Sequence, residues 1–435
     1  MTERIIGNIS ERRWEFPQPT VLIESQSAPA LAGAPVEQKY MRAFVLAKET
    51  DLVVTDFLLN EVYISQYLKG VLGFQLPEFI VVPDSDKGTL SGNILSNSES
   101  QDKILNWTKK WGDSVKVQFF NITSKEKELL NVLKLPSTSG NIDGSIEVGS
   151  KTGFRRFSNE YGLPMARGYI CSTIKETALA LENIFQNSNK ALIKSENGTG
   201  GTDLKSNIVF SKEEINGGTL DDLILTKLAE LDGFLGNEWV IEEFVEGNDG
   251  SVHVYINDCF KTEKPFVLGA ISQDNSYVGG YWPSQTDEKT KTLIDYVSKV
   301  AVPNLQKLGV YGYHCFDFKG SKFLEDNTRP GALDFIDGFV GRISKHHFPN
   351  EKYSYYHMHV PISRPTTFNE VWSFLHSVMN PANAGNGKFL VVSNPEVLPF
   401  GRSLDLTAVC FGPTSSLDSA KQYFEVAKNY VQSIL

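Results

Sequence analysis

The chain reads HCFDFKGSKFLEDNTRPG over residues 314–331. Two runs rich in apolar residues flank the turn Lys319-Gly320-Ser321, and this pattern predicts an antiparallel hairpin. Asp317 lies on the first predicted strand. Glu325 and Asn327 lie two residues apart on the second strand, so their side chains should share one face. The hairpin is therefore expected to bring three oxygen-bearing side chains close together.

Two carboxylates and an amide oxygen on one face repel each other unless a cation lies between them. Hard oxygen ligands of this kind suit Mg²⁺, which also takes phosphate oxygens. Arg329 follows on the same face, where its guanidinium can hold a phosphoryl group or a carboxylate. Read alone, the segment could also be a solvated polar hairpin, but the aromatic and leucine neighbours of Asp317 and Glu325 argue against an exposed face.

A second signal lies near residue 194. Lys194 ends the apolar strand 191–193, and the loop SENGTGGTD (195–203) follows it before another predicted strand. Backbone N–H groups of a glycine-rich loop can close over phosphates, which makes Gly198, Gly200 and Gly201 candidate phosphate-binding residues. A dinucleotide-binding fingerprint is excluded, because the third glycine is missing and a strand follows. The alternative is an ordinary hairpin loop.

The stretch GSIEVGSKT (144–152) resembles a Walker A motif but fails by one residue, because Ser150 separates Gly149 from Lys151. We therefore reject a P-loop fold. Lys151 is expected at the start of a helix, where it can still reach phosphate. The alternative is a surface lysine.

Residues 239–249, WVIEEFVEGND, predict a strand that leads into a turn. The backbone at such a strand edge can receive an adenine ring, and a carboxylate a few residues further on can accept ribose hydroxyls. An edge strand with solvent-facing glutamates is the alternative interpretation.

The order of these signals resembles the nucleotide site of the ATP-grasp superfamily, over about residues 145–345. The resemblance implies that Lys151 and Lys194 contact nucleotide phosphates. It also implies adenine contacts for Glu242, Glu243 and Val245 (the valine through its backbone), ribose binding by Asp249, and phosphoryl and acyl-phosphate stabilisation by Arg329. One or two Mg²⁺, for which Mn²⁺ could substitute, would be held by Asp317, Glu325 and Asn327.

Within this superfamily the chain looks most like the pheganomycin-type peptide ligases, which carry a pre-ATP-grasp domain. The supporting residues are GSKTGFRRF (149–157) and EYGLP (160–164), with a looser fit at 51–54 and 72–73. Two features depart from the family pattern. The turn between Asp317 and Glu325 is shorter than in many members, and His253 stands where an acidic residue is frequent.

The expected fold class is α/β (α+β), with an ATP-grasp domain between two smaller units. We expect a pre-ATP-grasp α/β domain over 1–145, an ATP-grasp domain over 146–345 with a lid subdomain at about 165–245, and a small C-terminal α+β unit over 346–435. Two segments are expected to lack regular structure because of their composition, the first 35 residues or so and the polar stretch 85–102, which is expected to be a surface loop. The Gly- and Ser-rich stretch 136–149 is expected to connect two domains.

Composition limits the partners. The 435 residues carry a net charge of −10, which argues against nucleic acid as a main partner. The four cysteines are scattered without metal-site spacing, and no run of 18 apolar residues occurs. The N-terminus lacks the apolar segment of a signal peptide. We therefore expect a cytoplasmic protein with no membrane partner. A homodimer is one expected state of assembly.

The resemblance implies an ATP-dependent ligase that joins a carboxylate to an amine through an acyl phosphate and releases ADP and phosphate. Its substrates would be small molecules, an amino acid or peptide on each side. Two alternatives stay open, a kinase acting on a small-molecule hydroxyl and a non-catalytic ATP-binding module. The pairs His346-His347 and His357/His359 could hold a transition metal, although structural roles are the favoured interpretation. Arg155, Arg156 and Arg342 are candidates for gripping a substrate carboxylate.

Overall fold

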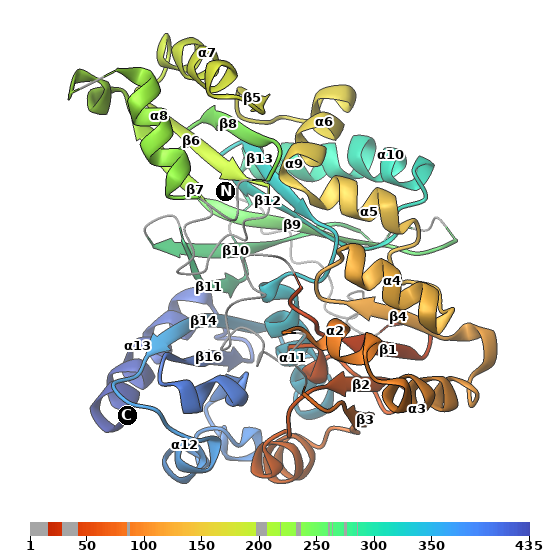
Figure 1. Cartoon of the computed structure of the whole chain (residues 1–435). Helices are drawn as coiled ribbons and strands as arrows, with labels where there is room; N and C mark the ends of the chain where they lie inside the picture. Colours follow the sequence, from red (N-terminus) through yellow and green to blue (C-terminus); the bar gives the residue numbers. More distant parts are fainter. Residues whose placement is uncertain are drawn as a thin grey trace.

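The computed structural model describes residues 16–27, 42–84, 88–196, 207–217, 219–231, 236–259, 262, 264–273, 276–284 and 286–435. These residues form three β-sheets with helices around them (Figure 1). Gly198, Gly200 and Gly201 of the predicted phosphate loop lie outside the described residues. No helix in the described part of the chain is long and apolar enough to cross a membrane.

The N-terminal sheet is parallel, with strand order β3-β2-β1-β4. Its strands are β1 (Thr20–Ile23), β2 (Leu52–Thr55), β3 (Glu78–Val81) and β4 (Lys116–Phe119). Both β1 and β2 are buried along their whole length, as expected for a parallel sheet covered on two faces. The helices of this region are η4 (Val62–Val71), α2 (Leu90–Leu95), α3 (Ser98–Thr108) and α4 (Ser124–Leu133).

Two expectations of irregular structure are wrong within the described residues. The N-terminal stretch supplies the central strand β1. The polar stretch 85–102 contains α2 and the first half of α3, because Thr89 and Asn97 cap these helices by accepting backbone N–H groups. The stretch 136–149, expected to connect two domains, contains α5 (Ile142–Gly149), capped in the same way by Asn141. At the start of α2, α3 and α5 alike, a polar residue typical of loops caps a helix.

A second sheet is antiparallel and small, with strand order β5-β8-β6-β7. Its strands are β5 (Gly168–Cys171), β6 (Lys190–Ser195), β7 (Asn207–Ser211) and β8 (Trp239–Glu243). Helices α7 (Ile174–Phe185) and α8 (Leu220–Ala229) pack on it and share a separate apolar core with its strands. Figure 1 shows this unit, in yellow and green, above the edge of the large sheet.

The large sheet has eight antiparallel strands in the order β13-β12-β9-β10-β11-β14-β16-β15. They are β9 (Asp249–Ile256), β10 (Phe266–Gln273), β11 (Ser276–Trp282), β12 (Gly312–Lys319), β13 (Lys322–Asn327), β14 (Tyr353–Pro361), β15 (Lys388–Ser393) and β16 (Ser403–Phe411). The three C-terminal strands thus continue the sheet that carries the predicted metal hairpin. Residues of η4 and of the C-terminal strands also belong to one apolar core.

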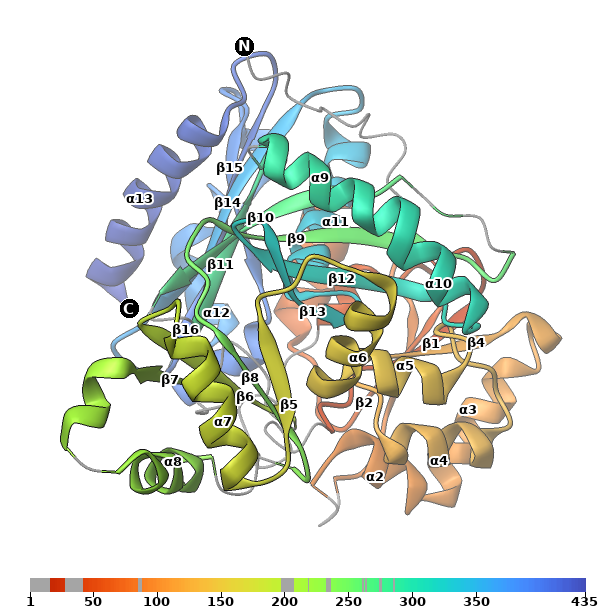
Figure 2. The same cartoon turned by 90° about the horizontal axis from the view of Figure 1, so that it is seen from above.

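Helices cover both faces of the large sheet. Helix α6 (Lys151–Tyr161) has Ser150 as its N-cap and Gly162 as its C-cap, so Lys151 starts a helix as the sequence predicts. The helices α9 (Glu288–Tyr296), η7 (Val297–Ala301) and α10 (Val302–Lys307) run end to end along the sheet (Figure 2). Helices α11 (Ala332–His347), α12 (Phe368–Leu375) and α13 (Leu417–Ile434) complete this part. The observed architecture is the mixed α/β class that the sequence predicts.

The predicted hairpin 314–331 is confirmed, with one difference in its turn. Strand β12 extends to Lys319, which pairs with Lys322, so the turn contains only Gly320 and Ser321. Continuing that register would place Leu324 opposite Asp317. A β-bulge between Asp317 and Phe318 shifts the pairing, and Glu325 lies opposite Asp317 instead. The bulge therefore creates the pair of facing carboxylates.

Glu24, directly after β1, offers a test of this N-terminal packing. Its side chain is buried, and Oε2 accepts the N–H of Ala43 at 2.7 Å. Burial raises its pKa from 4.5 to about 8, although the charge of Arg42 opposes the shift. A folded-state pKa above the unfolded value means that stability is greatest below the unfolded pKa and is lost as the pH rises towards about 8.

We expect Glu24→Gln to remove most of this pH dependence, because the amide stays neutral. Between about pH 5 and pH 8 the wild-type free energy of unfolding should fall by on the order of 3 kcal/mol more than that of the variant. Urea unfolding at the two pH values measures the difference. Equal losses in both proteins would contradict a protonated Glu24.

Candidate active site

A cavity of about 850 Å³ lies where the three sheets meet. The loop 120–125 after β4 contributes one wall, and residues of β6 and β8 contribute another. The third wall comes from β9 and from the hairpin β12–β13, together with residues 329–333 at the start of α11. The cavity volume is large enough for a nucleotide together with a second small molecule.

Asp317, Glu325 and Asn327 meet on one face of the hairpin. The Nδ2 of Asn327 donates to Asp317 Oδ2 at 2.9 Å and lies 3.4 Å from Glu325 Oε1. Burial and the charge of Glu325 raise the pKa of Asp317 above its usual range. Burial alone would also raise the pKa of Glu325, but the nearby Lys151 lowers it. The two carboxylates are therefore close enough to repel each other, as the sequence predicted.

Two cations lie against this cluster. Lys151, the first residue of α6, forms an ion pair with Glu325, and Arg329 donates from Nη1 to Asn327 Oδ1 at 2.6 Å. Burial lowers the pKa of the Arg329 guanidinium. A set of two carboxylates and one amide fits Mg²⁺, since all donors are oxygen atoms once the amide of Asn327 turns over. The mutual repulsion of the carboxylates is what a divalent cation would relieve.

Lys194 connects the small sheet with the hairpin. Its Nζ lies 2.5 Å from Glu242 Oε1 and donates to the carbonyl oxygen of Leu324 at 3.1 Å. The other oxygen of Glu242 pairs with Arg155, whose Nη1 donates to Ala166 O at 2.6 Å. Lys194, Glu242 and Arg155 are all buried. One carboxylate between two buried cations fixes the lysine ammonium at the cavity wall, beside Glu325.

The segment that follows β8 forms another part of the wall. Two backbone N–H groups at the end of β8 have partners, since Glu243 N donates to Arg167 O at 2.9 Å and Phe244 N to Lys190 O at 3.1 Å. Val245 and Asp249 also line the cavity, and Asp249 lies 3.3 Å from Lys319. The strand-and-turn geometry expected from the sequence is thus present.

The structure brings the predicted residues that it describes into this one cavity. They are Lys151, Lys194, Glu242, Glu243, Val245, Asp249, Asp317, Glu325, Asn327 and Arg329. Their roles towards a nucleotide stay predictions. The three arginines suggested for a substrate carboxylate are engaged elsewhere. Arg155 pairs with Glu242, Arg156 with Glu238, and Arg342 donates to the carbonyl oxygens of Val45 and Ala47.

The histidine pairs have local contacts instead of a shared metal geometry. His347 lies 3.1 Å from the carbonyl oxygen of Leu72, and His357 Nδ1 lies 3.0 Å from Thr407 Oγ1. Burial lowers the pKa of His357 to about 3. These contacts agree with the structural roles favoured by the sequence.

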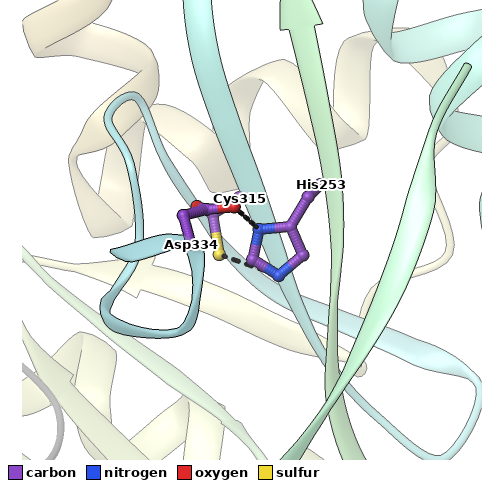
Figure 3. Close-up of side chains that lie close together, drawn as sticks. All are labelled: His253, Cys315 and Asp334. Carbon is purple, nitrogen blue, oxygen red and sulfur yellow. Dashed lines mark hydrogen bonds and ion pairs between the residues drawn. The ribbon is translucent and has the colours of Figure 1, made fainter. Parts of the chain in front are cut away.

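Sequence reasoning missed a buried group beside the carboxylates, formed by His253, Cys315 and Asp334 (Figure 3). His253 and Cys315 line the cavity. His253 faces Cys315 across β9 and β12, and Asp334 comes from the first turn of α11. The alternation of Ser251 with His253, and of Cys315 with Asp317, places all four on the same sheet face. The sequence alone reveals this alternation along each strand, but only the strand order shows that β9 lies next to β12.

Comparisons with known proteins identify the fold. No family model and no curated protein matches the chain. Solved structures match over nearly its whole length. An N5-carboxyaminoimidazole ribonucleotide synthetase, determined as an ADP complex, is 13% identical, with a TM-score of 0.59, over 96% of this chain and 98% of the other.

Two further structures agree. The Aspergillus clavatus N5-carboxyaminoimidazole synthase, in complex with ADP and 5-aminoimidazole ribonucleotide, is 11% identical with a TM-score of 0.57, over 97% of this chain and 100% of the other. Biotin carboxylase from Campylobacter jejuni, in a complex with an ATP-type nucleotide, is 11% identical with a TM-score of 0.57, over 94% and 90%. The chain therefore has the ATP-grasp fold, as the sequence predicts, and at this identity the likeness carries the fold alone.

Proposed function

We propose that this chain is an ATP-dependent, ADP-forming ligase that activates a carboxylate as an acyl phosphate and joins it to an amine. The observation that carries the proposal is the set of side chains gathered in the cavity. Two lysines and an arginine surround two carboxylates and an amide. A site for phosphoryl transfer needs positioning and charge neutralisation of this kind. The ADP and ATP-type complexes of the structurally similar proteins support the same reading.

The position of each residue in the cavity suggests its role in binding the nucleotide and Mg²⁺. Lys194, fixed by Glu242, would hold the nucleotide phosphates from the small sheet, and Lys151 would hold them from the start of α6. Asp317, Glu325 and Asn327 would bind Mg²⁺, which supplies positive charge to the phosphate oxygens. The backbone around Glu243 and Val245 would receive the adenine ring, and Asp249 the ribose.

Arg329 would serve the reacting carboxylate. Its guanidinium contacts Asn327 and lies over the ring of Phe120, 5.0 Å from the ring centroid. The planar fork of an arginine can hold a carboxylate and the phosphoryl group that it receives. In the proposed reaction a carboxylate oxygen attacks the γ-phosphorus and ADP leaves. The amine then attacks the acyl carbon and phosphate departs. We propose amino acids or peptides as the two substrates.

The test is hydroxamate formation. Purified protein is incubated with ATP, MgCl₂ and hydroxylamine, and each proteinogenic amino acid is offered in turn as the carboxylic acid. Hydroxylamine traps an acyl phosphate as a hydroxamate, so the assay needs no knowledge of the natural amine. We expect one acid or a small group of acids to give hydroxamate together with equal amounts of ADP and phosphate. A phosphorylated hydroxyl product without free phosphate would show a kinase instead.

Lys194→Ala should weaken ATP binding by about 10- to 100-fold, because a hydrogen bond between charged groups contributes about 1.5–3 kcal/mol. The fold should survive, since Glu242 keeps its pair with Arg155. Lys190→Ala is the matched control, because Lys190 starts the same strand but is exposed and lies outside the cavity. Isothermal titration calorimetry measures both affinities. Equal affinities for the two variants would remove Lys194 from the nucleotide site.

A further inference from the structure

A buried histidine lines the cavity next to the proposed metal ligands. His253 is 2% exposed, stacks on Phe266 with ring centroids 5.3 Å apart, and lines the cavity. Two residues before it on β9, Ser251 donates its hydroxyl to Asp317. The imidazole and the Asp317 carboxylate therefore lie on the same face of the sheet, in neighbouring positions.

Asp334 orients this imidazole. Its Oδ1 lies 2.8 Å from His253 Nδ1, and its Oδ2 accepts the N–H of Gly331 at 2.6 Å. Figure 3 shows the carboxylate against one ring nitrogen and the Cys315 sulfur near the other. The Nδ1–Oδ1 pair is close, but the two atoms are not aligned as a linear hydrogen bond. In active sites without bound substrate, hydrogen bonds between catalytic groups are often poorly aligned. A carboxylate beside Nδ1 favours the tautomer with its proton there and leaves a lone pair on Nε2.

The Cys315 sulfur is the nearest group to His253 Nε2, at 4.0 Å, and it makes a shorter contact with Asp317 Oδ1, to which it donates at 3.4 Å. The charged and titratable groups that face the imidazole are Asp334 from α11 and Cys315 and Asp317 from β12. The carboxylates Asp317 and Glu325 are the proposed metal ligands, and Lys151, Lys194 and Arg329 are cations. His253 therefore presents a ring nitrogen that can accept a proton beside the proposed metal ligands.

We infer that His253, oriented by Asp334, accepts the proton of the amine substrate. This inference rests on the ligase function proposed above. The amine enters as an ammonium ion, and Nε2 of His253 removes one proton to expose the nitrogen lone pair. The nitrogen then bonds to the acyl carbon, and the bond from that carbon to the phosphate oxygen breaks. Phosphate leaves with the electron pair and takes the second nitrogen proton.

The test compares two nucleophiles with the carboxylic acid found in the hydroxamate screen. Hydroxylamine is largely uncharged at neutral pH, so it attacks the acyl phosphate without prior deprotonation. The pooled proteinogenic amino acids serve as amines that must first lose a proton. We expect His253→Gln to lower amide formation by about 10²-fold or more, with hydroxamate formation changed by no more than about twofold. His376→Gln, at the exposed histidine that follows α12, is the matched control and should change neither rate.

Asp334→Asn is measured in parallel, so that the inference can still be tested if the buried His253 variant fails to fold. The asparagine side chain has nearly the same volume and can still accept the Gly331 N–H. This substitution should lower amide formation selectively in the same way. Equal losses with both nucleophiles would assign His253 a structural role, and no loss with either would end the inference. A wild-type protein that forms no hydroxamate with any acid would instead overturn the ligase function itself.

Discussion

Glu325→Gln should lower turnover by roughly 10²-fold or more, which corresponds to about 2.7 kcal/mol in the activation barrier. The substitution keeps the shape of the side chain but removes the charge opposite Asp317. Without that charge, Lys151 loses its ion-pair partner and the proposed Mg²⁺ loses one carboxylate ligand. Asn327→Ala should act in the same direction by removing the amide from the cluster.

ADP release in the presence of both substrates measures this effect, over a range of Mg²⁺ concentrations. Loss of a ligand should also raise the Mg²⁺ concentration needed for half-maximal rate. Glu238→Gln is the control, since Glu238 is an exposed glutamate paired with Arg156. Turnover of the Glu325 variant near that of the control would contradict the metal role of the hairpin.

Glu242→Gln should destabilise the protein by about 3–5 kcal/mol, because it removes the carboxylate between two buried cations. The side chains of Arg155 and Glu242 are each 2% exposed, and that of Lys194 is 6% exposed. In the variant, the charges of Arg155 and Lys194 would stay buried without compensation, and they would repel each other. The buried triad connects α6 with the small sheet, so its loss should also loosen the cavity wall.

The neighbouring pair Arg156–Glu238 provides an internal comparison. It joins the next residue of α6 to the residue just before β8, but its side chains are 45% and 41% exposed. Glu238→Gln should therefore cost no more than about 1 kcal/mol. Urea unfolding of both variants measures the difference. Similar free energies of unfolding would mean that the buried triad contributes little to the stability of the fold.

The hairpin with the proposed metal ligands could be predicted because the residues that determine it lie close together in the sequence. Asp317, Glu325 and Asn327 lie within eleven positions of each other on two strands joined by a tight turn. Alternation along each strand assigns their face. The β-bulge could not be predicted, since alternation along a strand does not reveal a shift of one position in the pairing with its neighbour.

Other features depend on contacts between segments that are distant in the chain. Arg155 looked like a substrate-binding residue because an arginine on a helix is usually exposed, and its partner Glu242 is 87 positions away. His253 and Asp334 meet because β9 lies beside β12 and α11 begins over that face. Capping residues such as Thr89 and Asn97 resembled loop residues, since a polar side chain that starts a helix is also common in turns.

The position of the divalent cation tests the central claim most directly. A crystal grown with a non-hydrolysable ATP analogue and Mn²⁺ would locate the ion by its anomalous scattering. We predict an ion within coordination distance of both Asp317 and Glu325 and of the nucleotide phosphates, with the amide of Asn327 turned to present its oxygen. An ion held by phosphates alone, with these three side chains directed elsewhere, would contradict the account.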